Sequence, residues 1–373
     1  MDKYIGAAWR AASRFAFEGM PDDLQVFGNG HINETYRLRF SIGRMGALYV
    51  ILQKINKNVF HDPERLMGNI AGVTSWLRKK IVEEGGDPER ETLSLIPAKD
   101  GRSFLVDEDG EYWRAYRFIT DATSYDMAES AEDFRQSAIA FGTFQRRLAD
   151  YPADSLYESI PGFHDTAARF EAFKKAVAAD CRQRADGVRD EIAFVMEREE
   201  LAHRCEKAGA PLPLRVTHND TKLNNVMIDD KTHKGICVID LDTVMPGYVM
   251  NDFGDSIRFG ASSAAEDERD LSKVYCRLDL FKAYTEGFLQ ACAGRLTPAE
   301  TQLLPDGALI MTFECGMRFL TDYLQGDTYF RIHRPNHNLD RARSQFALLS
   351  DMERRLPQMR EIVEEAARQA LVK

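Results

Sequence analysis

A polar island inside a long helical region is the feature that most restricts how this chain can fold. The island, LRVTHNDTKLNNVMIDDKTHKGICVIDLDTVMPG, begins at Leu214. Its apolar segments VMI and ICVID flank DDKTHKG, a pattern that predicts a loop followed by a β-hairpin. Apolar residues at helical spacing predict helices on both sides of the island, over 131–148, 165–185, 190–208, 278–293, 298–324 and 338–356.

Residues 1–18 carry apolar residues at helical spacing, and the segments that follow, as far as residue 119, have the alternating apolar pattern of β-strands instead. Strands are predicted in LQVFGNGHINETYRLRF, with a turn at Gly28 and Gly30, and in ALYVILQKI, TLSLIPA, SFLVDEDG and EYWRAYRFI. One main helix, HDPERLMGNIAGVTSWLRKKI, has Pro63 in its first turn, where proline is favoured. We therefore predict a two-lobe α+β fold, with a β-rich small lobe at 1–119 and a mostly helical large lobe at 120–373 that contains the polar island.

Composition excludes several kinds of partner. The 373 residues carry a net charge of −10, and an acidic surface repels nucleic acid and anionic membranes. No segment approaches the roughly 20 apolar residues of a membrane span, and the charged N-terminal segment is unlike a secretory signal. The six cysteines form no CxxC pair, which is typical of free thiols in a reducing compartment. We therefore expect a cytoplasmic protein without nucleic-acid or membrane partners, and a monomer is the simplest assembly.

The polar island carries acidic and amide side chains at a regular spacing. Asn225 follows Asp220 by five residues, and Asp240 ends the second strand of the hairpin. An Asp followed five residues later by an Asn is the catalytic-loop spacing of protein-kinase-like phosphotransferases. In that chemistry Asp220 accepts the proton of an attacking hydroxyl, while Asn225 and Asp240 offer oxygen ligands to Mg²⁺. We therefore predict a protein-kinase-like fold, in which the hairpin folds Asp240 back towards Asn225 and both reach one metal site.

Other interpretations of the island are a polar loop whose side chains cap turns, and a metal hydrolase that uses His218 and Asp220 as ligands. The second lacks the further histidines that such a site requires. His218 is expected to be a structural residue that braces the loop. Asp242, Asp252 and Asp255 add carboxylates nearby. They are candidates for a second Mg²⁺ or for bracing the loop, and Asp252 and Asp255 are expected to cap the helix that follows.

Two segments of the island resemble a known family. HNDTKLNN and VIDLDT are similar to the Brenner-type motif and the metal-binding motif of the aminoglycoside phosphotransferase and choline kinase superfamily. Further segments resemble its N-acetylhexosamine 1-kinase branch in content and order: GNGHINETY, ILQKINKNVFHDPERLMGNI, YRFI, IPGFHDT, DLDTVMPG, DFGDSIRFGA, RFLTDYLQGDTYF and ARSQFALLSDME. The resemblance covers residues 26–353. It implies ATP as co-substrate, Mg²⁺ as cofactor, and transfer of the γ-phosphate to the anomeric hydroxyl of N-acetylglucosamine or N-acetylgalactosamine.

The nucleotide is expected to contact the small lobe at three places. The turn after the first strand, with Asn29, Gly30 and Asn33, is placed to cover the triphosphate, although it lacks the third glycine of GxGxxG. The position of the usual phosphate-binding lysine holds Gln53, and Lys54 lies beside it on the opposite strand face. Which of these two residues contacts phosphate is left open, and His61, Glu64 and Asn69 are left without a role. The end of the last strand, Arg117, Phe118 and Ile119, is expected to be a hinge whose backbone binds the adenine.

The resemblance also implies a sugar site made of His31, Asp220, Phe259, Arg318 and Tyr329. Phe259 would face the sugar ring, and Tyr329 would close the site with its hydroxyl. A purely structural alternative for Arg318 is an ion pair with Glu314 or Asp322 along one helix. The structural alternative for Tyr329 is a packed position in the core.

Two rival functions remain after the motifs are weighed. The first is a kinase of the same superfamily that acts on another hydroxyl, such as that of an amino alcohol or an aminoglycoside. An arginine such as Arg318 near the acceptor argues against a cationic substrate. The second rival is a nucleotide-binding module without turnover, against which the intact Asp220, Asn225 and Asp240 argue.

Overall fold

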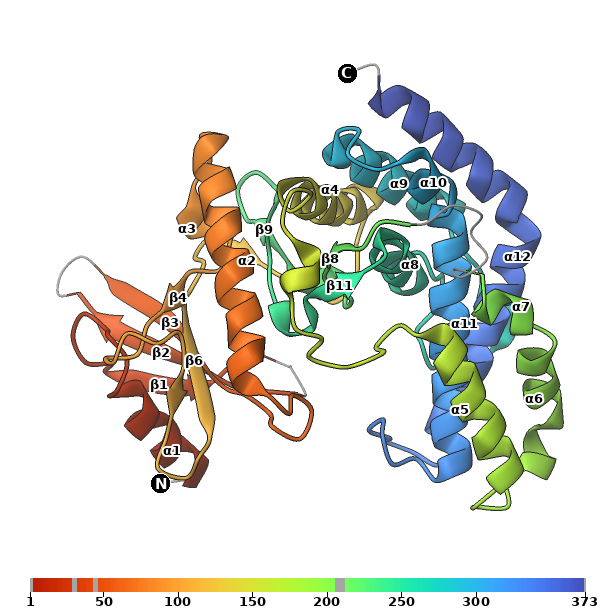
Figure 1. Cartoon of the computed structure of the whole chain (residues 1–373), viewed down its shortest axis with the longest axis horizontal. Helices are drawn as coiled ribbons and strands as arrows, with labels where there is room; N and C mark the ends of the chain where they lie inside the picture. Colours follow the sequence, from red (N-terminus) through yellow and green to blue (C-terminus); the bar gives the residue numbers. More distant parts are fainter. Residues whose placement is uncertain (1–2, 29–31, 43–45, 205–211, 372–373) are drawn as a thin grey trace. The chain divides into compact units, whose positions relative to one another are not determined.

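The computed structural model describes residues 3–28, 32–42, 46–204 and 212–371. The chain divides into two compact units. The first unit comprises Met1–Thr123, Asp150–Pro161 and Met227–Met245, and the second comprises Ser124–Ala149, Gly162–Val226 and Pro246–Lys373 (Figure 1). The first is built on an antiparallel sheet and the second is largely helical, which confirms the predicted α+β, kinase-like class. The predicted lobe boundary at 119/120 stays a prediction.

The main sheet of the first unit has the order β1-β2-β3-β6-β4, and β5 also pairs with β6. Its strands are β1 (Asp23–Val26), β2 (Glu34–Ser41), β3 (Ala47–Lys54), β4 (Leu95–Ile96), β5 (Leu105–Val106) and β6 (Tyr112–Arg117). Every pair is antiparallel. The five predicted strand segments are thereby confirmed.

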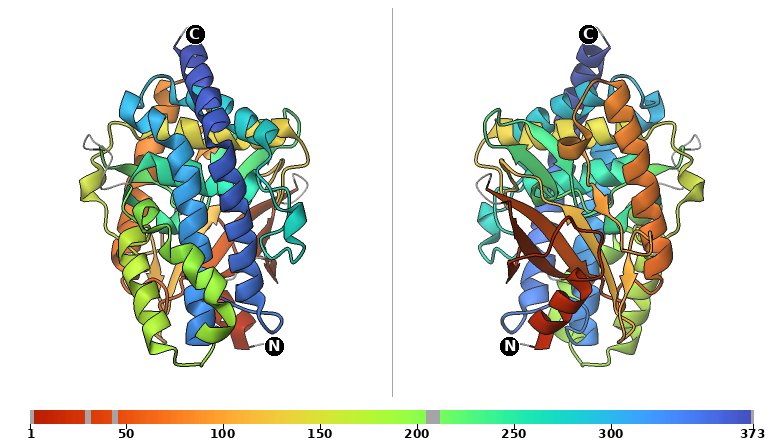
Figure 2. Two further views of the ribbon diagram at one scale, coloured as in Figure 1. Left: turned by 90° about the vertical axis from the view of Figure 1, so that its right-hand side faces the viewer. Right: turned by 90° about the vertical axis from the view of Figure 1, so that its left-hand side faces the viewer.

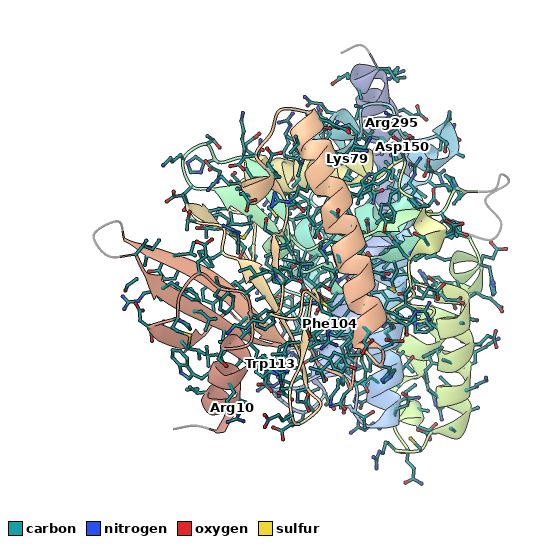
Figure 3. The ribbon with its side chains drawn as sticks, turned by 60° about the vertical axis from the view of Figure 1, so that its left-hand side comes forward. Arg10, Lys79, Phe104, Trp113, Asp150 and Arg295 are labelled. Carbon is teal, nitrogen blue, oxygen red and sulfur yellow. The ribbon has the colours of Figure 1, made fainter. Side chains whose placement is uncertain are left out.

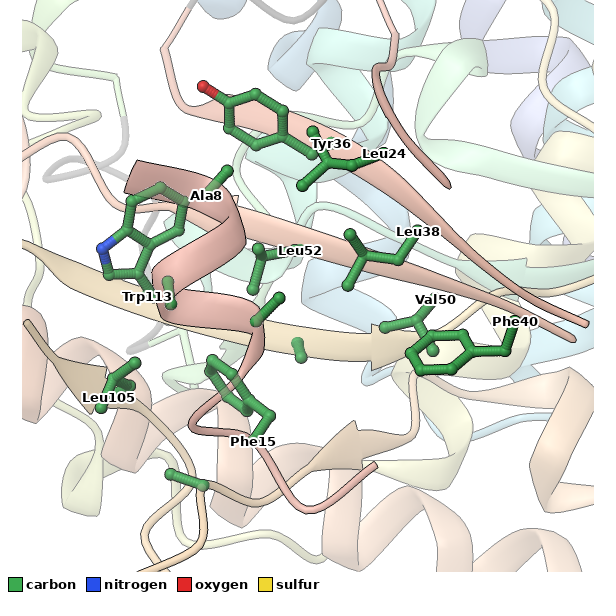
Figure 4. Packing of buried hydrophobic residues seen from close by; sticks show 14 residues of the cluster. Ala8, Phe15, Leu24, Tyr36, Leu38, Phe40, Val50, Leu52, Leu105 and Trp113 are labelled. Carbon is green, nitrogen blue, oxygen red and sulfur yellow. The ribbon is translucent and has the colours of Figure 1, made fainter. Parts of the chain in front are cut away.

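A helix covers one face of this sheet and completes the core of the first unit. Helix α1 (Lys3–Ala12) presents small residues such as Ala8 to the sheet, and Phe15 follows it into the same cluster (Figure 4). From the strands, Leu52 and Trp113 enter the cluster without exposed surface. Along β3 the buried Val50 and Leu52 alternate with half-buried residues, which produces a period-two pattern, whereas both faces of β6 are buried.

Helix α2 (Pro63–Glu83) is the main helix predicted in this part of the chain. The carboxylate of Asp62 caps it by accepting a hydrogen bond from the backbone N–H of Arg65. One face is buried through Leu66, Ile70 and other apolar residues, while Lys79 on the opposite face points away from the sheet (Figure 3). The short helix α3 (Pro88–Glu91) follows.

The polar island forms the predicted hairpin. Strands β9 (Val226–Asp229) and β10 (Gly235–Val238) pair with each other, and β7 (Ala122–Thr123) pairs with β9 on its other side. The Asp229 carboxylate stabilises the turn by accepting hydrogen bonds from the backbone N–H groups of Lys231 and Thr232. Donors from Thr232 lower the pKa of Asp229 to about 2.

The second unit is a layered set of helices around a small strand pair, β8 (Arg215–Thr217) and β11 (Met245–Gly247). Its helices are α4 (Ala131–Arg147), α5 (Thr166–Ala179), α6 (Arg189–Met196), α7 (Glu199–Ala202), α8 (Val249–Gly260), α9 (Leu278–Cys292), α10 (Pro298–Gln302), α11 (Leu304–Gln325) and α12 (His337–Ala370). The long helices α11 and α12 lie side by side (Figure 2). None of the helices within the described residues is long and apolar enough to cross a membrane.

Three of the predicted helices end or break earlier than expected. The helix predicted over 165–185 ends at Ala179 because Asp180 adopts the left-handed conformation, with φ 33°. The one predicted over 190–208 is broken at Arg198, whose guanidinium binds Glu353, and its part from 205 lies outside the described residues. The one predicted over 298–324 is divided at Leu303, because Pro305 opens a new helix.

The last helix was predicted too short. Helix α12 continues past Leu356 through Pro357, a residue that has no N–H to donate and usually ends a helix. Met359, Val363 and Ala366 beyond the proline are buried. Their burial offsets the lost hydrogen bond, so the helix extends to Ala370.

Candidate active site

The segment that carries Asp220 lies in the second unit, between β8 and a single 3₁₀ turn at Leu223–Asn225. His218 is fully buried, with its ring 5.5 Å from the Phe141 ring centroid. The backbone N–H of Asp220 lies 3.3 Å from His218 Nδ1. His218 thus has the bracing role that was predicted for it.

Asp220 and Asn225 are brought together by the 3₁₀ turn. The amide Nδ2 of Asn225 donates to the Asp220 carbonyl oxygen at 2.8 Å and lies 3.2 Å from Asp220 Oδ2. Lys222 Nζ lies 2.8 Å from Asp220 Oδ1. Burial alone would lower the pKa of Lys222, but the Asp220 carboxylate beside it raises that pKa above its usual value. The Asp220 carboxylate is therefore oriented by two donors, of which only Asn225 was singled out from the sequence.

Two carboxylates of α8 hold this loop, and the prediction that they cap the helix is wrong. Tyr248 is the N-cap, and Asp252 and Asp255 lie inside the helix. Asp252 accepts hydrogen bonds from the backbone N–H groups of His218 and Asn219, at 2.9 and 2.8 Å. Asp255 accepts from the backbone N–H of Thr221 at 3.0 Å. Both side chains therefore brace the loop that carries Asp220, and bracing was the alternative considered from the sequence.

These two carboxylates differ in their electrostatics. Burial raises the pKa of Asp252. Burial acts in the same direction on Asp255, but the charges of Arg258 and Lys222 outweigh it and hold the pKa of Asp255 below its usual value. Arg258 makes a buried ion pair with Asp255 at 2.9 Å. Of the two carboxylates on α8, Asp252 is thus held by hydrogen bonds from backbone N–H groups, and Asp255 is held by an ion pair.

Asp240 lies in the first unit, at the end of β10. It is exposed and adopts the left-handed conformation, with φ 58° and ψ 61°, at the start of a 3₁₀ turn formed by Leu241–Thr243. An exposed carboxylate and an amide oxygen such as that of Asn225 are ligand types that Mg²⁺ accepts. Among the described residues no group of three or more His, Cys, Asp or Glu side chains could hold a metal. That Asn225 and Asp240 share one Mg²⁺ stays a prediction.

A buried ion pair holds the turn that follows Asp240. The two terminal guanidinium nitrogens of Arg114, on β6, donate to the two oxygens of Asp242. The side chains of Arg114 and Asp242 are 1% and 5% exposed. Asn33 Nδ2 also donates to Asp242 Oδ2, at 2.5 Å. Asp242 is thus occupied by protein donors, and its structural role replaces the second-metal role considered from the sequence.

The two candidates for phosphate contact on β3 both have partners in the first unit. Gln53 donates to Thr35 Oγ1 at 3.0 Å and accepts from Arg114 Nε at 2.9 Å. Lys54, on the other face, forms an ion pair with Glu34 at 2.5 Å. Gln53 lies directly opposite Arg114 in the pairing of β3 with β6. The choice between Gln53 and Lys54 as a phosphate contact stays open.

Asn69 on α2, which had no predicted role, joins two distant segments of the first unit. Its Nδ2 donates to the carbonyl oxygens of Tyr157 and Val244, at 2.7 and 3.1 Å, and its Oδ1 accepts from the backbone N–H of Tyr157. The side chain is almost fully buried. It therefore fixes the end of the turn that begins at Asp240.

An Arg114→Met substitution is expected to lower the free energy of unfolding by about 3–5 kcal/mol, because it leaves the Asp242 carboxylate buried without its cation. An Arg114→Met/Asp242→Leu double variant should recover at least half of that loss. Denaturant unfolding of both variants measures the effect. The control is Arg102→Met, which breaks an ion pair whose members are 47% and 45% exposed and should cost no more than about 1 kcal/mol. Equal losses for Arg114→Met and Arg102→Met would contradict the structural role.

The remaining nucleotide-site predictions are only partly covered by the described residues. Asn29, Gly30 and His31 lie outside them. Asn33 has both ends of its amide engaged, since Oδ1 accepts from the backbone N–H of Asn56 at 3.0 Å. At the predicted hinge, the backbone N–H of Arg117 donates to Ser94 and that of Phe118 to Tyr49. The side chain of Ile119 is buried.

Arg318 and Tyr329 come together in the second unit, whereas no ring contact joins Phe259 to either of them among the described residues. The guanidinium carbon of Arg318 lies 5.6, 5.8 and 5.4 Å from the ring centroids of Phe163, Tyr329 and Phe330. The residue makes no hydrogen bond or ion pair with another described residue, so the predicted alternative of a salt bridge is wrong. Tyr329 is 68% exposed, which excludes the packed core position. Phe259, on α8, has only Arg258 over its ring, at 6.0 Å.

Glu314 has partners other than the one considered from the sequence. It is completely buried on α11, and it binds His164 and Thr166 rather than Arg318. Arg169 lies 3.6 Å from the same carboxylate. Burial, followed by the nearby charge of Arg318, lowers the pKa of Arg169. The charges of Arg169 and Arg318 thus act on one another, and the carboxylate of Glu314 beside Arg169 is shared with His164.

Comparison with known proteins identifies the family of the chain. A sequence model of the phosphotransferase enzyme family, APH, matches residues 88–286, more than half of the chain. The chain therefore belongs to the phosphotransferase enzyme family. ATP is the typical co-substrate of this family, so the protein is a small-molecule kinase by class.

Solved structures share the fold over nearly the whole chain. A microcompartment-associated aminopropanol kinase matches with a TM-score of 0.60 and 17% identity, covering 95% of this chain and 98% of that one. An aminoglycoside phosphotransferase from Alicyclobacillus acidocaldarius matches with a TM-score of 0.62 and 14% identity, over 95% and 96%. A choline kinase from Cryptosporidium parvum matches with a TM-score of 0.58 and 12% identity, over 97% and 98%. At identities this low, the structural similarity shows a common fold and does not identify the substrate.

Proposed function

We propose that the protein transfers the γ-phosphate of ATP to the anomeric hydroxyl of an N-acetylhexosamine, giving the sugar 1-phosphate. The class of reaction follows from the family. The choice of a neutral sugar is carried by Arg318, a half-buried guanidinium over three aromatic rings that makes no hydrogen bond or ion pair with another described residue.

The charge around Arg318 favours a neutral acceptor over a cationic one. Arg169 adds a second positive charge, and the carboxylate of Glu314 is shared with His164. An amino alcohol or an aminoglycoside would bring a further positive charge to this place, where a quaternary or primary amine requires carboxylates or an aromatic cage. An acetamido carbonyl oxygen, by contrast, is an acceptor that a guanidinium can bind.

In the proposed reaction Asp220 accepts the proton of the sugar hydroxyl. The O–H bond breaks, the sugar oxygen bonds to the γ-phosphorus, and the bond between the β- and γ-phosphates breaks to release ADP. Asn225 and Lys222 hold the carboxylate of Asp220 in one orientation for this transfer. Asn225 and Asp240 are the proposed Mg²⁺ ligands, and a bound Mg²⁺ neutralises phosphate charge.

An anomeric hydroxyl suits this base. It is more acidic than a primary hydroxyl, so a carboxylate is better matched to its proton. We therefore expect N-acetylglucosamine or N-acetylgalactosamine to react at the anomeric oxygen. The methyl glycoside of the same sugar should be inert, and a 6-deoxy analogue should still react.

The experiment is a panel of sugars and amino alcohols with ATP and Mg²⁺, in which ADP release is measured and NMR locates the new phosphate. Plain glucose should be poorer than N-acetylglucosamine by about 5- to 150-fold in kcat/KM, because buried donors lose the acetamido partner. Phosphorylation of the methyl glycoside would exclude the anomeric assignment. Preference for an amino alcohol or an aminoglycoside would exclude the sugar and leave only the kinase class.

A further inference from the structure

His164 joins the catalytic loop to a buried carboxylate of α11. Its side chain is 8% exposed. Nδ1 lies 2.9 Å from Glu314 Oε1, and Nε2 lies 3.2 Å from the carbonyl oxygen of Asn219. All three residues belong to the second unit.

Both groups that face the imidazole are hydrogen-bond acceptors. The Asn219 carbonyl has no proton to donate. Glu314 receives a hydrogen bond from Thr166 Oγ1 at 2.7 Å and has Arg169 at 3.6 Å. Burial acts to raise the pKa of Glu314, but His164 and Arg169 outweigh burial and lower that pKa. Because a carbonyl oxygen can only accept, His164 Nε2 is the donor to Asn219, and Nδ1 is within hydrogen-bond distance of Glu314.

The peptide group that His164 holds is the one immediately before the catalytic base. Asn219 has a left-handed backbone, with φ 65°, a conformation that needs support in a residue other than glycine. The carbonyl of the Asn219–Asp220 peptide faces His164 Nε2, and its N–H faces His218 Nδ1. Two histidines thus hold the two polar ends of one peptide plane, and this plane sets the direction in which the Asp220 side chain leaves the backbone.

We propose that His164, held between Glu314 and the Asn219 carbonyl, is a positioning residue that orients Asp220. Glu314 lies one helical turn before Arg318 on α11, so the same helix that carries the proposed acceptor contact also supports the base. The inference rests on the proposed function only in that Asp220 is taken as the base. It does not depend on which acceptor is phosphorylated.

Two substitutions separate the two hydrogen bonds of His164. In His164→Gln the amide nitrogen can take the place of Nε2 and keep the bond to Asn219, while the bond to Glu314 is lost. In His164→Asn the amide nitrogen can take the place of Nδ1 and keep the bond to Glu314, while the bond to Asn219 is lost. We expect His164→Asn to lose at least about 10-fold in kcat with little change in the KM for ATP, and His164→Gln to keep most of the activity.

The expected order of thermal stability of these two variants is the opposite of their expected order of activity. His164→Gln leaves Glu314 buried without its strongest partner, so its thermal unfolding midpoint should lie below that of His164→Asn. The matched control is Thr166→Val, which removes a donor from Glu314 without touching Asn219. It should lower the midpoint and leave kcat unchanged. A residue with a merely structural role would instead lower kcat in step with the midpoint in all three variants.

The rates are measured as ADP release, both with the acceptor that the panel identifies and without acceptor, where water attacks ATP. The acceptor-free rate tests His164 even if no N-acetylhexosamine reacts, so failure of the proposed substrate and failure of this inference are distinguishable. A wild-type kcat in His164→Asn in both assays would overturn the proposal. So would a fall in kcat that follows the unfolding midpoints of the three variants.

Discussion

An Asp220→Asn variant is expected to lose about 10²- to 10⁴-fold in kcat, because the amide cannot accept the proton of the attacking hydroxyl. The fold should persist, since the new side chain keeps a carbonyl oxygen for Asn225 Nδ2. Lys222 loses an anion at 2.8 Å, but the remaining loop contacts to Asp252 and Asp255 are untouched. Affinity for ATP should therefore change far less than turnover.

Single-turnover phosphoryl transfer measures the expected loss of rate, and calorimetry measures the affinity for ATP. Asp186→Asn is the matched control, since it makes the same chemical change on a side chain that is 89% exposed and paired only with Arg189. It should leave both measurements unchanged. Turnover near the wild-type rate in Asp220→Asn would remove Asp220 from the role of base.

The elements that could be predicted from the sequence are those with a strong local pattern. The alternation in ALYVILQKI and EYWRAYRFI predicted β3 and β6, and the hairpin that ends at Asp240 was confirmed with its turn. The pairing of Asp220 with Asn225 could be predicted because only five residues separate them, and one 3₁₀ turn brings their side chains together. Helix ends were less predictable, since buried residues beyond Pro357 allow α12 to continue past a residue that usually ends a helix.

The residues that support the site could not be assigned because their partners are remote in the sequence. Arg114 and Asp242 are 128 residues apart, and His164 and Glu314 are 150 apart. A weaker signal was present: each of Arg114 and Glu314 is a charged residue within an apolar strand or helix, and such a residue needs a buried partner. The sequence does not say which partner, because only tertiary packing brings the two groups together.

An Asp240→Ala variant is expected to lose about 10²- to 10³-fold or more in kcat at ordinary Mg²⁺ concentration. Asp240 is the proposed carboxylate ligand, and charge stabilisation by a bound metal is worth several kcal/mol in the transition state. The fold should persist because the side chain is exposed and the following turn is held independently by Arg114 and Asn69. Asn225→Asp should be milder or change the preferred metal, because a carboxylate can still act as a ligand.

Rates measured across a series of Mg²⁺ and Mn²⁺ concentrations separate a weakened metal site from a damaged fold. A weakened site requires more metal for half-maximal rate, whereas a damaged fold lowers the unfolding midpoint without moving the metal dependence. Asp230→Ala is the control within the same hairpin, since Asp230 is exposed and its carboxylate accepts a hydrogen bond from Thr123. It should keep the wild-type metal dependence. Full activity of Asp240→Ala at ordinary Mg²⁺ would show that the metal is held by other residues, and the proposed pairing of Asp240 with Asn225 would then be wrong.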